Sequence, residues 1–170
     1  MIKRLIVFAF VAIPFCLSAQ TELKFATVNM QEIFTLMPET IEANKKISDL
    51  AKEYETEQQN IKNEFEKKYS AYVESREKMS DNIRVRREQE LQLISKSIED
   101  FMKVAQNDIK EQQQLLLDPI KKKLLETVQL VGAEGGYAFV IDECNMLYKG
   151  CAFEDITPVV KLKLGIEKKE

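Results

Sequence analysis

The sequence predicts an α+β protein, mostly α, in which a long antiparallel helical hairpin emerges from a small β-containing body. Residues 39–131 contain no glycine and a single proline, and Glu, Lys, Gln, Ile and Leu dominate them. Short β-type runs lie on either side, KFATVN at 24–29 and YAFVI at 137–141. Because glycine and proline are the strongest breakers of regular structure, this distribution favours long helices that stand on a compact base.

The first 19 residues are predicted to be a secretory signal peptide. Lys3 and Arg4 precede an uncharged apolar run at 5–17, and the small residues Ser18 and Ala19 follow it. This order is typical of an export signal, and the apolar run is shorter than the roughly 20 residues that a membrane-spanning helix needs. An uncleaved membrane anchor is the alternative.

The remaining chain, 20–170, is predicted to be one domain, with a body formed by 20–38 and 132–170. The two helical arms are placed at 39–79 and 83–131. The break between them is placed at Ser80-Asp81-Asn82, because these side chains compete with helical hydrogen bonding. Arms of roughly 40 to 50 residues would each be about 60–75 Å long.

The apolar positions of both arms follow steps of 3, 4 and 4 residues, which is an 11-residue period. At about 3.67 residues per turn, this period predicts nearly straight arms or a slight right-handed coil. On the first arm the stripe comprises Ile47, Leu50, Tyr54, Gln58, Ile61, Phe65, Tyr69, Tyr72, Arg76 and Met79. On the second arm it comprises Leu91, Ile94, Ile98, Met102, Ala105, Ile109, Gln113, Leu116, Ile120 and Leu124. Each stripe is narrow, so the arm is expected to flex, most of all at its far tip.

Pro119 lies inside the second arm and is predicted to mark a kink or hinge where the arm rejoins the body. Proline in a helix interior removes a backbone donor and costs about 3 kcal/mol. A kink that the helix tolerates without any function is the alternative.

The end of the chain is predicted to complete the body. Gly132 and the Gly135-Gly136 pair are expected to end the second arm, and 137–141 and 146–148 to form a β-hairpin. A short helix then begins with Thr157 as N-cap and Pro158 behind it. The predicted core of the body and of its oligomer interface is Phe25, Val28, Phe139, Ile141 and Leu147.

A three-stranded sheet of this size is a poor stand-alone core, since domains below about 70–80 residues rarely bury enough apolar surface. Association with further copies of the chain is therefore expected.

Composition argues against catalysis and against nucleic-acid binding. Without Lys3 and Arg4, 23 basic side chains face 28 acidic ones, and the chain has no histidine. Nucleic-acid binders rest on excess Lys and Arg, and histidine is the side chain best suited to acid–base work at neutral pH. No enzymatic activity, metal or cofactor is expected. Cys144 and Cys151 are too few for a four-thiolate zinc site.

Several segments together resemble the Skp/OmpH family of periplasmic chaperones. They are FATVNMQEIF near the start, MPETIEANKKI opening the first arm, QQQLLLDPIKKKL around Pro119, and GYAFVIDECNMLYKG with DITPVVKLKLGI at the end. The match covers essentially the whole mature length, in order, behind an export signal. It departs from the best-known pattern in charge, because that member is strongly basic and this chain has a pI of about 5.3.

The resemblance implies a homotrimer whose small β-barrel-like body carries three helical arms around a cavity. It implies an ATP-independent periplasmic holdase, which binds unfolded outer-membrane proteins, its clients, and prevents their aggregation. A structural or adaptor coiled-coil protein that spans envelope layers is the alternative function. The β segments at both ends of the arms and the spare aromatic residues favour the holdase.

A holdase needs many weak contacts rather than one tight site. Apolar side chains left over by the interhelical stripe are therefore the candidate client contacts. They are Tyr54, Phe65, Tyr69, Tyr72, Val73, Phe101 and Val104. Ordinary interhelical packing is the competing interpretation, above all for Tyr54, Phe65 and Tyr69.

The predicted arm tip is locally basic. Across 76–87 five cationic side chains oppose only Glu77 and Asp81, and these cations are Arg76, Lys78, Arg84, Arg86 and Arg87. A contact with anionic lipid or with acidic client segments is one interpretation. A solvated tip whose arginines pair with Glu88 and Glu90 is the other.

Two cysteines in an exported chain ordinarily suggest a disulfide. Here Cys144 lies in the predicted turn and Cys151 beyond the far end of the returning strand. A strand of five residues would separate them by about 16 Å, whereas a disulfide needs Cα atoms within about 7 Å. A local disulfide is therefore not expected.

Overall fold

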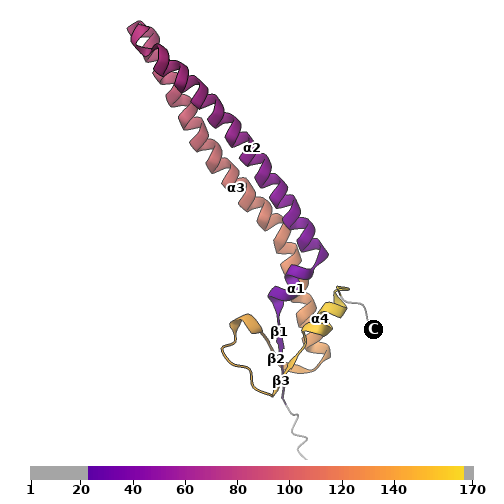
Figure 1. Cartoon of the computed structure of the whole chain (residues 1–170). Coiled ribbons are helices and arrows are strands. Elements are labelled where there is room, and N and C mark those ends of the chain that lie inside the picture. The colour runs from indigo at the N-terminus through magenta and orange to yellow at the C-terminus, as the bar shows by residue number, and fades with distance from the viewer. Residues whose placement is uncertain (1–22, 167–170) are drawn as a thin grey trace, which may run out of the picture.

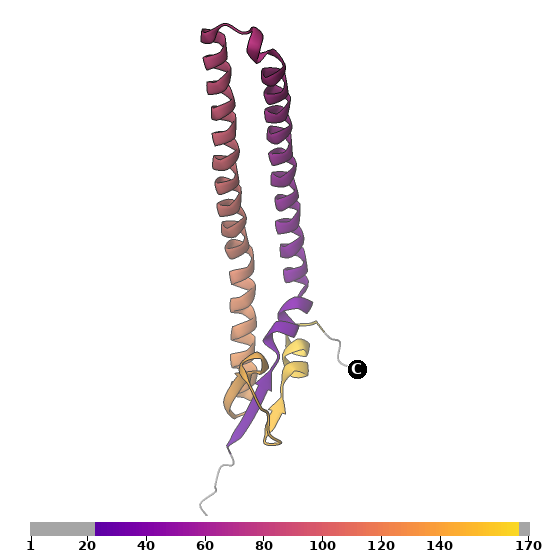
Figure 2. The same cartoon turned by 60° about the vertical axis from the view of Figure 1, so that its left-hand side comes forward.

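The computed structural model describes residues 23–166, so the signal peptide predicted at 1–19 lies outside the described residues. A helical hairpin of two long helices stands on a small body that contains a three-stranded sheet (Figure 1). In both views the two long helices run side by side from the tip to the start of the first helix, beyond which the second continues into the body, and the hairpin tip is far from the body (Figure 2). The predicted fold class, α+β and mostly α, is confirmed.

The sheet is built around β1 (Lys24–Val28), with β2 (Tyr137–Asp142) on one side and β3 (Phe153–Asp155) on the other. Both pairings are parallel, and Phe25 is opposite Phe139 on one side and Phe153 on the other. The predicted β-hairpin is therefore wrong. A tight turn can join only antiparallel strands, whereas two parallel strands require the chain to return along the sheet between them.

The return begins with a short 3₁₀ helix, η2 (Glu143–Asn145), in place of the predicted turn. The Asp142 carboxylate accepts the Cys144 backbone N–H at 3.3 Å and starts this helix. Residues 146–148, predicted as the second hairpin strand, form no strand, and β3 follows the loop instead.

This connection places the two cysteines at opposite ends of the sheet. Cys144 follows the end of β2, whose last residue pairs with Val28, and Cys151 precedes Phe153, which pairs with Phe25. Both thiols are exposed and free in the structure. The separation is set by the length of β1, so a bridge between the two within one chain would require the loop to leave the sheet.

A short helix, α1 (Met30–Leu36), leads from the sheet into the arm. Asn29 caps it, accepting the Glu32 backbone N–H at 2.9 Å. The first arm helix, α2 (Pro38–Ser75), then begins with proline at a position where a missing N–H does no harm. A 3₁₀ turn, η1 (Arg76–Lys78), forms the tip, and α3 (Asp81–Glu134) returns to the body.

The tip break lies slightly earlier than predicted. The chain leaves the helix after Ser75, and α3 already begins at Asp81, where a break was expected. Asp81 stabilises the first turn of α3, because its carboxylate binds the Arg84 guanidinium at 2.7 Å and an acidic group favours a helix N-terminus. Asp81 therefore starts a helix here instead of interrupting one.

The 11-residue period predicted for the whole arm is wrong for the outer half of α2. Tyr69 and Arg76, predicted to face inward, are exposed, and Lys68 and Ser75 take the half-buried positions instead. The inward positions then repeat every seven residues, as in a coiled coil. They are Gln58, Ile61, Phe65, Lys68, Tyr72, Ser75 and Met79. On α3, likewise, Phe101 and Gln112 face inward where Met102 and Gln113 were expected.

The core of the body joins the base of α3 to the sheet, to α1 and to the C-terminal helix α4 (Thr157–Lys163). Its buried members are Ala26, Val28, Ile33, Met37, Leu124, Val128, Val131, Ile156 and Val160. Thr157 lies one residue inside α4, not at its N-cap, and its hydroxyl accepts the Asn29 backbone N–H at 2.9 Å. The two ends of the chain are therefore held together at the base of the arm.

Glycine ends α3 later than Gly132, which is buried inside the helix beside Val140. Gly135 is the C-cap, and Gly136 has a φ of 67°.

We expect Gly136→Ala to lower the free energy of unfolding by about 1–2 kcal/mol, because alanine is strained in the left-handed region. Urea denaturation measures the change. Gly150→Ala is the matched control, since an added Cβ there meets only Tyr148 at 3.9 Å, and an equal loss in both variants would contradict the expectation.

Candidate functional site

The apolar side chains predicted as contact residues divide into two groups on the arm. Tyr54, Phe65, Tyr72 and Phe101 are half-buried along the seam between α2 and α3. The other three are mostly exposed, with relative exposures of 51% for Tyr69, 54% for Val73 and 61% for Val104. The exposed group is available to a partner without any opening of the arm.

Tyr54 and Phe101 form an aromatic contact across the seam in the inner half of the arm. The ring centroids are 5.7 Å apart and the rings meet edge to face, at 63°. The Tyr54 hydroxyl donates to the Asp108 carboxylate at 2.7 Å, and this hydrogen bond raises the pKa of Tyr54 above its ordinary value. The bond fixes the ring in the seam, and hollows lie on both sides of the pair.

Farther out, Phe65 and Tyr69 stack on each other along α2, with centroids 6.0 Å apart and ring planes 12° apart. Phe65 faces the seam while Tyr69 points outward. The stack therefore continues the apolar seam onto the outer surface of the arm.

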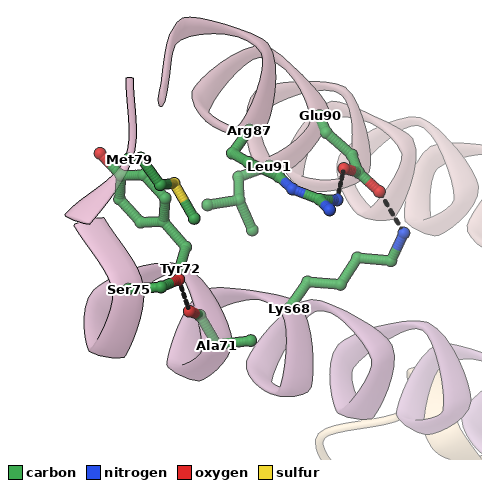
Figure 3. A pocket seen from close by; sticks show the side chains of 8 residues that line it. All are labelled: Lys68, Ala71, Tyr72, Ser75, Met79, Arg87, Glu90 and Leu91. Carbon is green, nitrogen blue, oxygen red and sulfur yellow. Dashed lines mark hydrogen bonds and ion pairs between the residues drawn. The ribbon is translucent and has the colours of Figure 1, made fainter. Parts of the chain in front are cut away.

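A small pocket lies between the helices just below the tip (Figure 3). Lys68 on α2 and Arg87 on α3 both bind the Glu90 carboxylate, Arg87 at 2.8 Å. The Tyr72 hydroxyl binds Glu88 beside them. The apolar part of the lining comes from Ala71, Met79 and Leu91. Polar contacts thus join the helices where the apolar seam is thinnest.

These polar contacts are expected to make the stability of the outer arm depend on pH in the acid range. Lys68, and after it Arg87, hold the pKa of Glu90 below its ordinary value of 4.5. A lowered folded pKa contributes stability above the ordinary value and loses it as the pH falls through the folded pKa. In urea denaturation we expect wild type to be more stable than Glu90→Gln at pH 7, with the difference vanishing in acid. Glu66→Gln, at a site with no ion pair among the described residues, is the control. A wild-type advantage over Glu90→Gln that did not change with pH would contradict this mechanism.

The basic tip is only partly neutralised. Arg84 pairs with Asp81 and Arg87 with Glu90, while Glu88 accepts from Tyr72 and not from an arginine. Arg76, Lys78 and Arg86 form no ion pair within residues 23–166. Two exposed apolar side chains, Ile83 and Val85, lie among these cations. The sequence analysis did not single out either residue, although both lie within the segment 76–87 that it identified as basic.

A row of exposed apolar side chains on α3 contains Val104, which was predicted, and Leu93 and Leu115, which were missed. Leu93, Val104 and Leu115 are 69%, 61% and 65% exposed. They are spaced 11 residues apart, so they lie on one face of the helix, about three turns from one to the next. The 11-residue spacing in the sequence could have revealed this row. The row gives the arm a discontinuous apolar surface outside the seam.

The structure buries some of the apolar side chains predicted for the core of the body and leaves others exposed. Val28 is buried, and Phe25 stacks on Phe139 at 6.2 Å and contacts Phe153 at 5.6 Å. Phe139 and Leu147 are exposed, and Ile141 borders on exposed. Phe139 and Ile141 lie on the outer face of β2, an edge strand, and Leu147 lies in the loop between β2 and β3. None of the three therefore joins the core within one chain. An intermolecular interface is what would bury them.

Pro119 lies within α3, which continues on both sides of it. Four residues later Lys123 binds Glu39 at the start of α2, so an ion pair ties the two helices at this level. The hinge at Pro119 stays a prediction.

Within residues 23–166 no group of three or more potential ligands is placed to hold a metal ion. The helices of the same region include none that is long and apolar enough to cross a membrane.

The chain matches the family OmpH, outer membrane protein (OmpH-like), over residues 24–164. Among solved structures it is similar to a putative outer membrane chaperone (OmpH-like) from Caulobacter crescentus CB15, with a TM-score of 0.69 and 14% sequence identity. The match covers 84% of this chain and 83% of that one, and at this identity it shows a shared fold. No curated protein matches. Since the family match spans the sheet, both arms and α4, the chain belongs to the OmpH-like family.

Proposed function

We propose that this protein is an ATP-independent periplasmic holdase, which binds unfolded outer-membrane proteins and prevents their aggregation. The observation that carries the proposal is the arm itself, a long two-helix projection with exposed apolar side chains outside its own seam. Membership of the OmpH-like family and the fold shared with a putative outer membrane chaperone support it.

The contacts on the arm suit weak, distributed binding. Val73, Val104 and Leu115 are separated from one another along the arm by polar and charged residues, so no single one of them forms a large apolar surface. Several such contacts acting together raise the apparent affinity, while the client retains much of its chain entropy. A binding role of this kind requires no catalytic group, in agreement with a chain that lacks histidine.

We further propose that the active unit is a homotrimer joined through the bodies. Phe139 and Leu147 are large apolar side chains left exposed on one chain, and burial of such a surface drives association. Multi-angle light scattering on the mature protein gives the molar mass, and a monomer at working concentrations would contradict this arrangement.

Suppression of aggregation tests the holdase function. A urea-unfolded outer-membrane protein is diluted into buffer with and without a molar excess of the mature chain, and turbidity is followed without ATP. A holdase keeps the client soluble. Unchanged turbidity would instead favour the alternative function, a structural or adaptor coiled-coil protein of the cell envelope.

The basic tip is proposed to contact anionic lipid headgroups. Arg76, Lys78 and Arg86 lack ion-pair partners in the described part of the chain, and Ile83 and Val85 can enter the headgroup region beside them. Each cation near an anionic surface contributes about 1 kcal/mol.

Replacing Arg76, Lys78 and Arg86, the cations without ion-pair partners among the described residues, by glutamine is expected to weaken binding to vesicles that contain phosphatidylglycerol by at least tenfold. Cosedimentation at low salt measures this, with vesicles of neutral phosphatidylcholine as control. If the variant and the wild type bind anionic vesicles equally, the lipid contact is rejected and the tip is only a solvated end of the arm.

A further inference from the structure

A groove in the inner half of the arm combines an aromatic wall with an acidic rim. It lies on one side of the Tyr54–Phe101 pair and is lined by Leu50, Glu53, Tyr54, Thr56, Glu57 and Phe101. The hydrogen bond from Tyr54 to Asp108 and the edge-to-face contact with Phe101 hold both rings in place. The apolar wall is therefore fixed before anything binds.

Within residues 23–166, no lysine or arginine neutralises the acidic rim. Residues 53–61 contain three glutamates and no lysine or arginine. Neither Glu53 nor Glu57 has an ion-pair partner among the described residues, whereas Glu42, Asp49 and Glu64 on the same helix each pair with a lysine. A cation brought to this rim would meet two carboxylates that no internal lysine or arginine occupies.

The two properties together define one kind of occupant. An apolar or aromatic side chain fits against Tyr54 and Phe101, and a lysine or arginine beside it fits the glutamates. A cation can also lie over the face of an aromatic ring, which is a favourable electrostatic contact. In an extended chain, side chains two residues apart point to the same side, about 7 Å apart. A segment with a cation and an aromatic residue in that relation presents both to the groove.

We propose that this groove binds extended segments of an unfolded client in which a lysine or arginine lies two residues from an aromatic side chain. The proposal rests on the holdase function and names the class of segment that the inner arm selects. Strands of outer-membrane barrels carry aromatic side chains at both membrane interfaces, and the next residue on the same face, two positions farther out, lies beyond the apolar band, where a lysine or arginine costs little; such strands therefore supply these segments. The selection is opposite in charge to that expected of the basic tip.

Two synthetic peptides with capped ends test the proposal. Both alternate tyrosine and threonine and differ only in two positions, which are lysine in one and glutamate in the other. They are titrated into the isotopically labelled mature chain, and binding is followed by NMR chemical shifts. We expect the lysine peptide to bind about fivefold more tightly at low salt, because two exposed ion pairs are gained. Salt should remove the difference.

The variant E53Q/E57Q is expected to lose the preference for the lysine peptide. Glutamine has nearly the helix propensity of glutamate and both sites are exposed, so the arm remains folded. The matched control is E66Q/E74Q, which removes two charges from exposed sites on α2 that do not line the groove. Equal binding of both peptides to wild type would overturn the proposal. So would a preference that survives in E53Q/E57Q, or one that the control variant loses to the same extent.

The aggregation assay keeps this test separate from the holdase function. If wild type protects an unfolded outer-membrane protein but shows no peptide preference, the groove proposal fails and the holdase stands. If wild type gives no protection, the holdase function fails, and the peptide titration still decides whether the groove binds cationic segments.

Discussion

Leu124→Ala should lower the free energy of unfolding by about 3 kcal/mol, a large effect for a single substitution. Leu124 is only 2% exposed and lies in the core where α3 meets the sheet, α1 and α4. Truncation removes the apolar contacts of the side chain and leaves a cavity that the surrounding helices and strands can fill only in part. Urea denaturation at a fixed protein concentration measures the loss, since association of copies also stabilises the folded state.

The neighbouring residue provides the control. Leu125 has the same chemistry and the same helix, but it is 47% exposed. Leu125→Ala should therefore cost less than about 1 kcal/mol. Similar losses for both variants would mean that the base of α3 is not packed in solution as described.

The largest functional effect is expected from the exposed row on α3. Replacing Leu93, Val104 and Leu115 together by glutamine should weaken client binding about tenfold or more, because in the proposed holdase each of these exposed side chains would bury apolar area against the client. The three positions lie outside the seam, and glutamine is a good helix former, so the arm itself should be retained. Competition for a fluorescent unfolded outer-membrane protein measures the affinity.

A control triple keeps the number and type of substitutions constant. Leu125, Leu130 and Val159 are also exposed leucine or valine residues, but they lie at the body end of the molecule. Their replacement by glutamine should change client affinity much less. If both triples weakened binding equally, overall apolar surface and not the row on the arm would determine affinity. Light scattering on both variants checks that the oligomer is unchanged.

The arms could be read from the sequence because their signal is local. A stretch of some 90 residues without glycine between two β-type runs permits few other structures, and Gly135 and Gly136 mark its end. The register of the seam was less accessible. Sequence reasoning placed Tyr69 inward because it is apolar, whereas the fold turns Lys68 inward, lays its aliphatic stem in the seam and brings its ammonium group to Glu90.

The sheet could not be derived in the same way, because its pairings join distant segments. Phe153–Asp155 is only three residues long, too short for an alternating pattern, and it pairs with a strand more than a hundred residues earlier. The run at 146–148 looked more strand-like, so a local hairpin was preferred over a long-range parallel pairing.

Only part of the candidate site could be predicted from the sequence, because the rest depends on contacts between distant residues. The aromatic residues of the arms stood out by type, but the unpaired state of Glu53 and Glu57 depends on where every lysine of the arm points.

The order in which the sheet is assembled bears on how the chain is delivered to its compartment. The central strand comes from the beginning of the chain, and both of its neighbours come from the end. The body cannot close while the last quarter of the polypeptide is still unsynthesised, and such high sequence separation also slows folding. For a protein that we propose to be exported, this delay would keep the body unfolded until residues 137–155 have been synthesised.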